Sequence, residues 1–176
     1  MNKIFIFLFP VIIFILSCNG QHVSQSKAIR FYDSINHQVN LTRAIQQKFI
    51  DSTTSAISKV KQNKNIIIDT FQLFKLLDSA KDMNRIRLKS IENIIEVDPE
   101  LNYKNKIVNH VKSVSFYYDN AFRECIQILG STSIDRYDKS RSLMMPALLD
   151  LKLQLNEIQT TKNDFKNKYN FTAPSQ

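Results

Sequence analysis

The chain is poor in glycine. Only two glycines, Gly20 and Gly130, occur among its 176 residues. Glycine-rich loops that hold phosphates or dinucleotides are therefore excluded. Sheets built from hairpins also depend on glycine-bearing turns, so this composition disfavours β structure.

Residues that bind metals or act as nucleophiles are also scarce. The sequence has no Glu-x-x-His pair, which excludes a di-iron bundle, and no closely spaced cysteines and histidines that would indicate zinc. A haem would have only His110 with Met144 or Met145 as ligands. Cys125 and His110 are 15 residues apart, about 22 Å along one helix, which is too far for a nucleophile and its base. We therefore expect a protein that is not an enzyme and has no cofactor or metal.

Two pairs of acidic residues, Asp78 with Asp82 and Glu92 with Glu96, are each one helical turn apart. Paired carboxylates can serve as general acid and base. Here basic residues lie among them on the same helix, so we interpret the four acids as solvated surface charges.

The first residues have the order of a secretory signal. Met1, Asn2 and Lys3 precede an apolar run from Ile4 to Leu16. The run has roughly 13 residues, whereas a permanent transmembrane helix needs about 20. The segment is therefore expected to direct export and not to remain as a membrane span.

The apolar run ends in Ile15-Leu16-Ser17-Cys18. This motif resembles the lipobox of bacterial lipoproteins, in which an aliphatic residue, a second tolerated residue and a small residue precede cysteine. The resemblance implies that residues 1–17 are removed and that lipid is attached to Cys18, which holds the protein to a membrane. It concerns the start of the chain only. The alternative is an ordinary signal peptide with a coincidental cysteine.

The resemblance also implies a place and a kind of partner. We expect a lipid-anchored protein of the bacterial cell envelope, in either the inner or the outer membrane, with residues 18–25 as a flexible tether. Removing residues 1–17 leaves 159 residues and a net charge of about +7, because Lys3 is the one charged residue removed. Export argues against nucleic acid as the partner of this basic surface and favours anionic lipid or an acidic protein. A solvated basic surface without a partner is the simpler interpretation.

Cys125 is the second and last cysteine of the chain. With Cys18 acylated, the mature protein has no internal disulfide, so its stability must come from packing. Cys125 falls on an apolar helix stripe and is expected to be a buried, unreactive thiol.

Apolar residues recur at spacings of three and four through four long segments, at about 25–62, 66–96, 99–129 and 134–170. The last segment has the most regular pattern, a heptad seam formed by Met144, Leu148, Leu151, Leu155, Ile158, Lys162, Phe165 and Tyr169. We predict an all-α fold, an antiparallel up-down-up-down four-helix bundle over residues 26–170 with a frayed tail at 171–176. An open helical array that closes only with a partner or a second copy is the alternative.

Four local signals set the expected helix ends. Asp69, three residues before Gln72, is expected to cap the second helix. The pair Asp98-Pro99 predicts the start of the third helix, and Gly130 predicts its end. Pro146 predicts either a kink in the last helix or a separate short helix from about 134 to 145.

Two surfaces are candidates for contact with a partner. Phe116 lies on the polar face of the third segment with Lys112 and Arg123, and next to Tyr117, which predicts an exposed aromatic beside positive charge. The other candidate is the apolar start of the second segment, over residues 66–76, which is wider than one stripe. A central position in the bundle also explains this width, and we expect that position rather than a partner surface.

These features favour a membrane-tethered, non-catalytic helical lipoprotein that binds a macromolecular partner, a protein of unknown identity, or supports an envelope assembly. One alternative is a bundle that binds an apolar small ligand or haem. Another is an immunity or inhibitor lipoprotein, which would bind one toxin or hydrolase tightly.

Overall fold

The computed structural model describes residues 23–171, and Cys18 and the expected signal lie outside this range. Within it the chain forms a helical bundle and no strand. The helices are α1 (Gln25–Gln62), α2 (Thr70–Glu92), α3 (Tyr103–Asp119), α4 (Ala121–Leu129) and α5 (Arg136–Lys168). The prediction of an all-helical bundle is confirmed. None of these helices is both long and apolar enough to cross a membrane.

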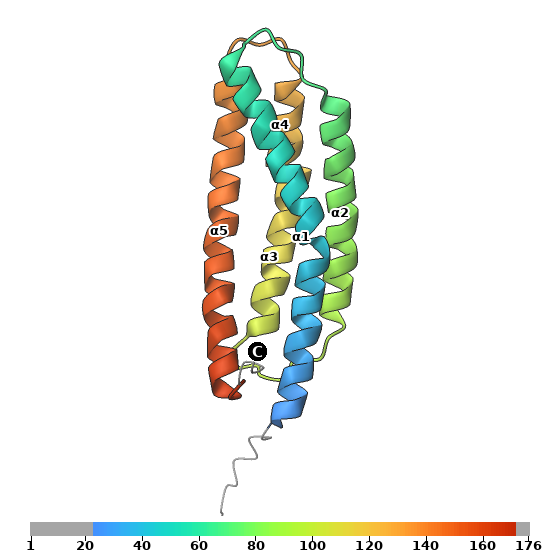
Figure 1. Cartoon of the computed structure of the whole chain (residues 1–176), viewed down its shortest axis with the longest axis vertical. Helices are drawn as coiled ribbons and strands as arrows, with labels where there is room; N and C mark the ends of the chain where they lie inside the picture. Colours follow the sequence, from blue (N-terminus) through green and yellow to red (C-terminus); the bar gives the residue numbers. More distant parts are fainter. Residues whose placement is uncertain (1–22, 172–176) are drawn as a thin grey trace, which may run out of the picture.

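The helices lie alongside one another, and α4 continues the direction of α3 (Figure 1). The 63–69 and 130–135 loops lie at one end of the bundle, called the far end below. The start of α1 and the 93–102 loop lie at the other end, called the near end below. α1 packs on α2, and α5 packs on both α3 and α4.

Capping residues fix the starts of the first two helices. The Ser24 hydroxyl accepts a hydrogen bond from the Lys27 amide, and the Asp69 carboxylate accepts one from the Gln72 amide at 3.3 Å. The predicted role of Asp69 is confirmed, and α2 is shorter than the apolar pattern that predicted it.

The third helix was predicted to be continuous, and this was wrong. The chain breaks at Asn120, which has φ −116° and ψ −95°, between α3 and α4. The Phe116 carbonyl accepts both the Asn120 backbone amide at 3.1 Å and the Asn120 side chain at 2.8 Å, and such a local side-chain bond competes with the helical pattern. The apolar spacing continues across the break, which is why the sequence predicted one helix.

Asp98 and Pro99 do not begin α3 directly. The Asp98 carboxylate accepts a hydrogen bond from the Leu101 amide at 3.2 Å, which closes a turn, and α3 begins at Tyr103 after Asn102 in a left-handed conformation (φ 54°). Asparagine tolerates this conformation better than most residues.

Gly130 follows α4 as predicted, but it is not in the left-handed conformation expected of a helix-ending glycine. A Cβ atom added at Gly130 would lie 2.7 Å from Thr70 Cγ2. Glycine therefore lets the end of α4 approach the first turn of α2 closely.

Pro146 lies inside α5, so the separate short helix is wrong and the chain remains helical through the proline. Proline removes the hydrogen bond to the carbonyl four residues earlier, that of Ser142. Pro146 and Ser142 are both exposed, so water can serve that carbonyl.

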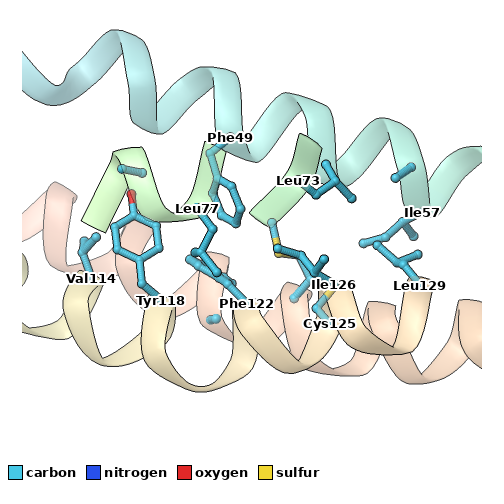
Figure 2. Close-up of a cluster of buried hydrophobic side chains, with 14 of the residues drawn as sticks. Phe49, Ile57, Leu73, Leu77, Val114, Tyr118, Phe122, Cys125, Ile126 and Leu129 are labelled. Carbon is cyan, nitrogen blue, oxygen red and sulfur yellow. The ribbon is translucent and has the colours of Figure 1, made fainter. Parts of the chain in front are cut away.

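Two apolar clusters form the core. The far-end core contains Phe49, Leu77, Phe122 and Met144, and Figure 2 shows its side chains meeting between the helices. The near-end core contains Phe31, Ile35, Tyr103 and Phe165. Phe171, expected in the frayed tail, packs edge-on against Tyr32 and Phe165.

Polar side chains lie between the two cores, and we call them the central polar layer: Thr42, Gln46, Asn84, Arg87, His110 and Gln154. These polar side chains explain one error in the predicted seam of α5. Leu155 is 49% exposed, whereas the neighbouring Gln154 turns inward to His110.

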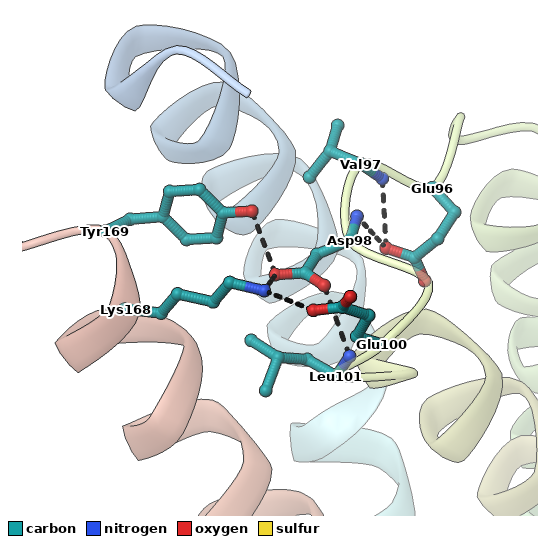
Figure 3. A network of polar contacts seen from close by, with 7 residues as sticks. All are labelled: Glu96, Val97, Asp98, Glu100, Leu101, Lys168 and Tyr169. Atoms are coloured by element: carbon teal, nitrogen blue, oxygen red, sulfur yellow. Dashed lines mark hydrogen bonds and ion pairs between the residues drawn. The ribbon is translucent and has the colours of Figure 1, made fainter. Parts of the chain in front are cut away.

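A polar network joins the end of α5 to the 93–102 loop (Figure 3). The buried Asp98 carboxylate accepts from the Tyr169 hydroxyl at 2.9 Å and pairs with the Lys168 amine at 2.8 Å. The Lys104 amine donates to the carbonyls of Glu92 and Ile94. The network fixes the near end of the bundle.

Asp98→Asn is expected to lower the free energy of unfolding by about 1–3 kcal/mol at pH 7, because the hydrogen bonds lose their charge. Burial raises the pKa of the Asp98 carboxyl, but hydrogen bonds from Lys168, Tyr169 and the Leu101 amide outweigh it and hold the pKa below its ordinary value. The stabilisation is therefore present above about pH 4 and is lost as the pH falls through the lowered pKa. Urea unfolding of both proteins from pH 7 to pH 2 measures this, and a constant difference would contradict it.

Candidate functional site

The predicted surface around Phe116 is only partly present. Phe116 is 62% exposed, but the Tyr117 hydroxyl donates to the Asp150 carboxylate of α5 at 2.9 Å. Lys112 pairs with Glu92 on α2 at 3.5 Å. Arg123 pairs with Asp78 on α2 at 3.6 Å and lies over the Phe74 ring. Three of the four side chains therefore contact neighbouring helices, although Lys112 and Arg123 remain 57% and 41% exposed beside Phe116.

The paired acids have structural partners. Asp78 pairs with Arg123, Asp82 with Arg85, and Glu92 with Lys112. The remaining acid, Glu96, accepts hydrogen bonds from the backbone amides of Val97, Asp98 and Lys104. Asp78, Asp82 and Glu92 therefore form surface ion pairs, and Glu96 binds backbone amides of the loop that follows α2.

The candidate haem ligands are not brought together. His110 bonds to Gln154 at 3.3 Å, and Met144 lies ten residues earlier on α5, about 15 Å away along the helix. Met145 is exposed. Within residues 23–171 no group of histidine, cysteine and acidic side chains could hold a metal ion.

Cys125 is fully buried in the far-end core. Burial raises the pKa of its thiol to about 12. A thiol with this pKa is almost entirely protonated at neutral pH and is a poor nucleophile. The predicted buried position is confirmed.

Three of the four most exposed large apolar side chains lie at the far end, and the fourth, Ile95, lies in the 93–102 loop at the other end and is 80% exposed. Ile67 is 93% exposed, Phe71 is 72% exposed and Ile134 is 78% exposed. We call these three residues the far-end surface. The wide apolar start of α2 was expected to be central, and for Ile67 and Phe71 this was wrong. Ile66, Ile68 and Phe74 do pack against the core.

Arg136 holds the segments of the far-end surface together. This residue is 4% exposed, and its guanidinium donates to four backbone carbonyls. Two belong to Leu129 and Ser131, at 3.1 and 2.8 Å, and two to Lys64 and Ile66 in the other loop. Both loops are therefore fixed relative to α5, and the exposed apolar residues project from a rigid support.

A groove of about 550 Å³ adjoins this surface, between α1 and the start of α2. Its α1 wall is polar and includes Asp51, Ser55 and Lys59, and its other wall includes Ile67 and Leu73. An apolar residue of a partner could enter the groove with its polar backbone facing α1.

Sequence reasoning missed Arg136 and Ile134. A signal for Arg136 was present, because steps of four from Met144 lead back through Ser140 to Arg136, and all three are buried. Ile134 lies in a short loop without a periodic pattern and gave no such signal.

Comparisons with known proteins add no relative. No family model matches the chain, and neither a curated protein nor a solved structure is significantly similar to it.

Proposed function

We propose that this chain is a membrane-tethered, non-catalytic helical lipoprotein of the bacterial envelope that binds a protein partner through the far-end surface. The observation that carries the proposal is the exposure of Ile67 and Ile134, on two loops that a buried arginine holds in place, and of Phe71 in the first turn of α2. Large apolar side chains exposed together at one end of a domain are typical of a protein–protein contact site.

The proposal includes the antiparallel up-down-up-down order of the helices, with a bend at Pro146. The alternating ends at which the connecting loops lie support this order (Figure 1). α1 begins at Gln25, seven residues after Cys18, at the near end of the bundle. It has 38 residues and is therefore about 57 Å long at 1.5 Å per residue. A lipid on Cys18 would place the far-end surface on the side away from the membrane.

Cys18→Ser is expected to abolish acylation and signal removal, so that the chain is no longer held by lipid. Several acyl chains on one residue bind a bilayer firmly, and each buried methylene contributes about 0.8 kcal/mol. Mass spectrometry of native material should find a lipid-modified N-terminus at residue 18, and alkaline extraction should leave it in the membrane fraction. Native material that begins at Met1 would contradict the anchor.

The double variant Ile67→Ser, Phe71→Ser is expected to lose the partner, with affinity reduced at least about 30-fold, because each truncated anchor residue typically costs 1–2 kcal/mol or more. The test is an affinity pull-down of the acylated protein from its own membranes, washed in salt, with quantitative mass spectrometry. Both residues are highly exposed, so the melting temperature should change little.

Phe116→Ser is the matched control, since it removes another exposed aromatic, 62% exposed against 72% for Phe71, from the side of the bundle. A partner retained by the double variant but lost with Phe116→Ser would move the site to α3. If the unchanged protein retains only lipid, the proposal that it binds a protein partner is wrong.

The same pull-down separates the alternatives. Recovery of a single toxin or hydrolase in a one-to-one ratio with this protein would identify an immunity or inhibitor lipoprotein. Stoichiometric lipid or haem would favour the ligand-binding bundle. Nucleic acid is not expected.

A further inference from the structure

α5 carries apolar side chains on two faces. One face is buried in the bundle and includes Met144 and Phe165. The opposite face carries Met145, Leu149 and Leu153, which are 53%, 59% and 56% exposed. A helix on the outside of a bundle needs only the first of these faces, and the second is normally polar. The fold of a single chain therefore does not account for the exposed apolar face of α5.

The other described helices have no comparable row. α1 exposes Ile29 and Leu41, which are twelve residues apart, and α2 exposes Phe71 and Ile86, which are fifteen apart. On α5 the three exposed residues recur at every fourth position, so they form one continuous row. A further exposed leucine of α5, Leu155, lies outside this row.

Charged residues of opposite sign lie at the two ends of the row. Arg141 is four residues before Met145, Glu157 is four residues after Leu153, and both are exposed. Neither forms an ion pair within residues 23–171. Residues four apart form one ridge on a helix surface, so these side chains make a ridge about 24 Å long. We call it the outer ridge of α5, with a positive end, an apolar middle and a negative end.

The order of these residues makes the outer ridge complementary to itself. Arg141 and Glu157 are each eight residues from Leu149. When two copies pair antiparallel, with Leu149 of each at the twofold axis, Arg141 of one lies beside Glu157 of the other at both ends of the contact. Met145 of each copy then faces Leu153 of the other. A parallel pair would instead place like charges together, which is unfavourable. Ridges of this kind commonly pack together in helical proteins, with the helices crossing at about −50°.

The same alignment offers a donor to a free backbone carbonyl. Pro146 removes the helical hydrogen bond to the carbonyl of Ser142. Ser142 and Asn156 are each seven residues from Leu149, so the antiparallel pair brings Asn156 of one copy opposite Ser142 of the other. Asn156 is exposed, and its side-chain amide donates to no group among the described residues. Lys152 lies beside the ridge, and its long stem lets the amine stay in water.

We propose that α5 binds a second copy of this chain through the outer ridge, in a symmetric antiparallel dimer. One helix of each copy supplies the contact, so its area is at the low end of specific interfaces. The association is therefore expected to be reversible, with a dissociation constant of about 10–100 μM. The far-end surface takes no part in this contact.

Sedimentation equilibrium of the full chain in non-ionic detergent, at concentrations from below to well above that constant, tests the dimer. Leu149→Lys should weaken association at least about 30-fold, because it places two ammonium groups together at the twofold axis. Ile86→Lys is the matched control, since Ile86 is 56% exposed on α2 and lies outside the ridge. An unchanged protein that stays monomeric, or a Leu149→Lys variant that associates equally well, would overturn the proposal.

Charge reversal tests the antiparallel alignment. Arg141→Glu and Glu157→Arg each place like charges at both ends of the dimer, and each should weaken association about tenfold. A mixture of the two variants should form a heterodimer with nearly the affinity of the unchanged protein, because opposite charges meet again at both ends. The far-end double variant Ile67→Ser, Phe71→Ser should still dimerise. A mixture that does not recover, or a far-end variant that stays monomeric, would overturn the proposal.

The near ends of the two copies point in opposite directions in this dimer, because α5 runs from the far end to the near end in each (Figure 1). On the lipid anchor proposed above, each Cys18 would then hold a different bilayer, and the dimer would join two apposed membranes. Phosphatidylcholine vesicles that carry the acylated protein should aggregate, and those that carry Leu149→Lys should not. Equal behaviour of the two would overturn this bridging. The detergent experiment needs no bilayer, so it tests the dimer separately from the anchor.

Discussion

Arg136→Met should lower the free energy of unfolding by about 3–5 kcal/mol, because it removes the partner of four backbone carbonyls at the far end. Methionine fills much of the same volume but donates no hydrogen bond. Urea denaturation followed by circular dichroism measures the change.

Arg141→Met serves as the control, because Arg141 is exposed on the same helix and should change stability by no more than about 0.5 kcal/mol. Hydrogen exchange should also become faster in the 63–69 and 130–135 loops of Arg136→Met than in the rest of the protein. A loss below 1 kcal/mol would mean that water replaces the guanidinium adequately, contrary to our account.

Phe49→Ala is expected to cost about 3–5 kcal/mol, through lost apolar burial and the cavity left behind. Phe49 is fully buried in the far-end core, and its ring lies 5.6 Å from the rings of Tyr118 and Phe122, centroid to centroid. Because α1 supplies Phe49 and α3 and α4 supply the other two rings, the loss affects three helices at once.

Phe116→Ala is the matched control for this cavity, since it truncates an exposed ring and should cost less than about 0.5 kcal/mol. Thermal and urea unfolding of both variants provide the comparison. Equal stability of the two variants would show that the far-end core is not packed as described.

Apolar periodicity predicted the helical class and most of the buried residues, because burial of one helix face is what that periodicity encodes. It could not predict the polar interior. Arg87 and Arg136 occupy buried positions on their helices, yet in a sequence they read as interruptions of the stripe.

The candidate site shows the same limit. A wide apolar band is expected both of a central helix and of a helix that presents apolar residues to a partner. Only the packed structure shows that Ile66 and Ile68 are half-buried while Ile67 and Phe71 point outward. The break at Asn120 was also hidden, because the apolar spacing runs through it unchanged.

The satisfied part of the central polar layer determines how the helices align along their length. If α2 shifted by one turn, about 5.4 Å, the Asn84 amide would lose its hydrogen bond to the Val111 carbonyl and would be buried in one of the apolar cores. An interior of leucine and isoleucine alone would tolerate such slippage far better. The Asn84 amide thus selects one register of the helices from several that would have nearly equal apolar contact.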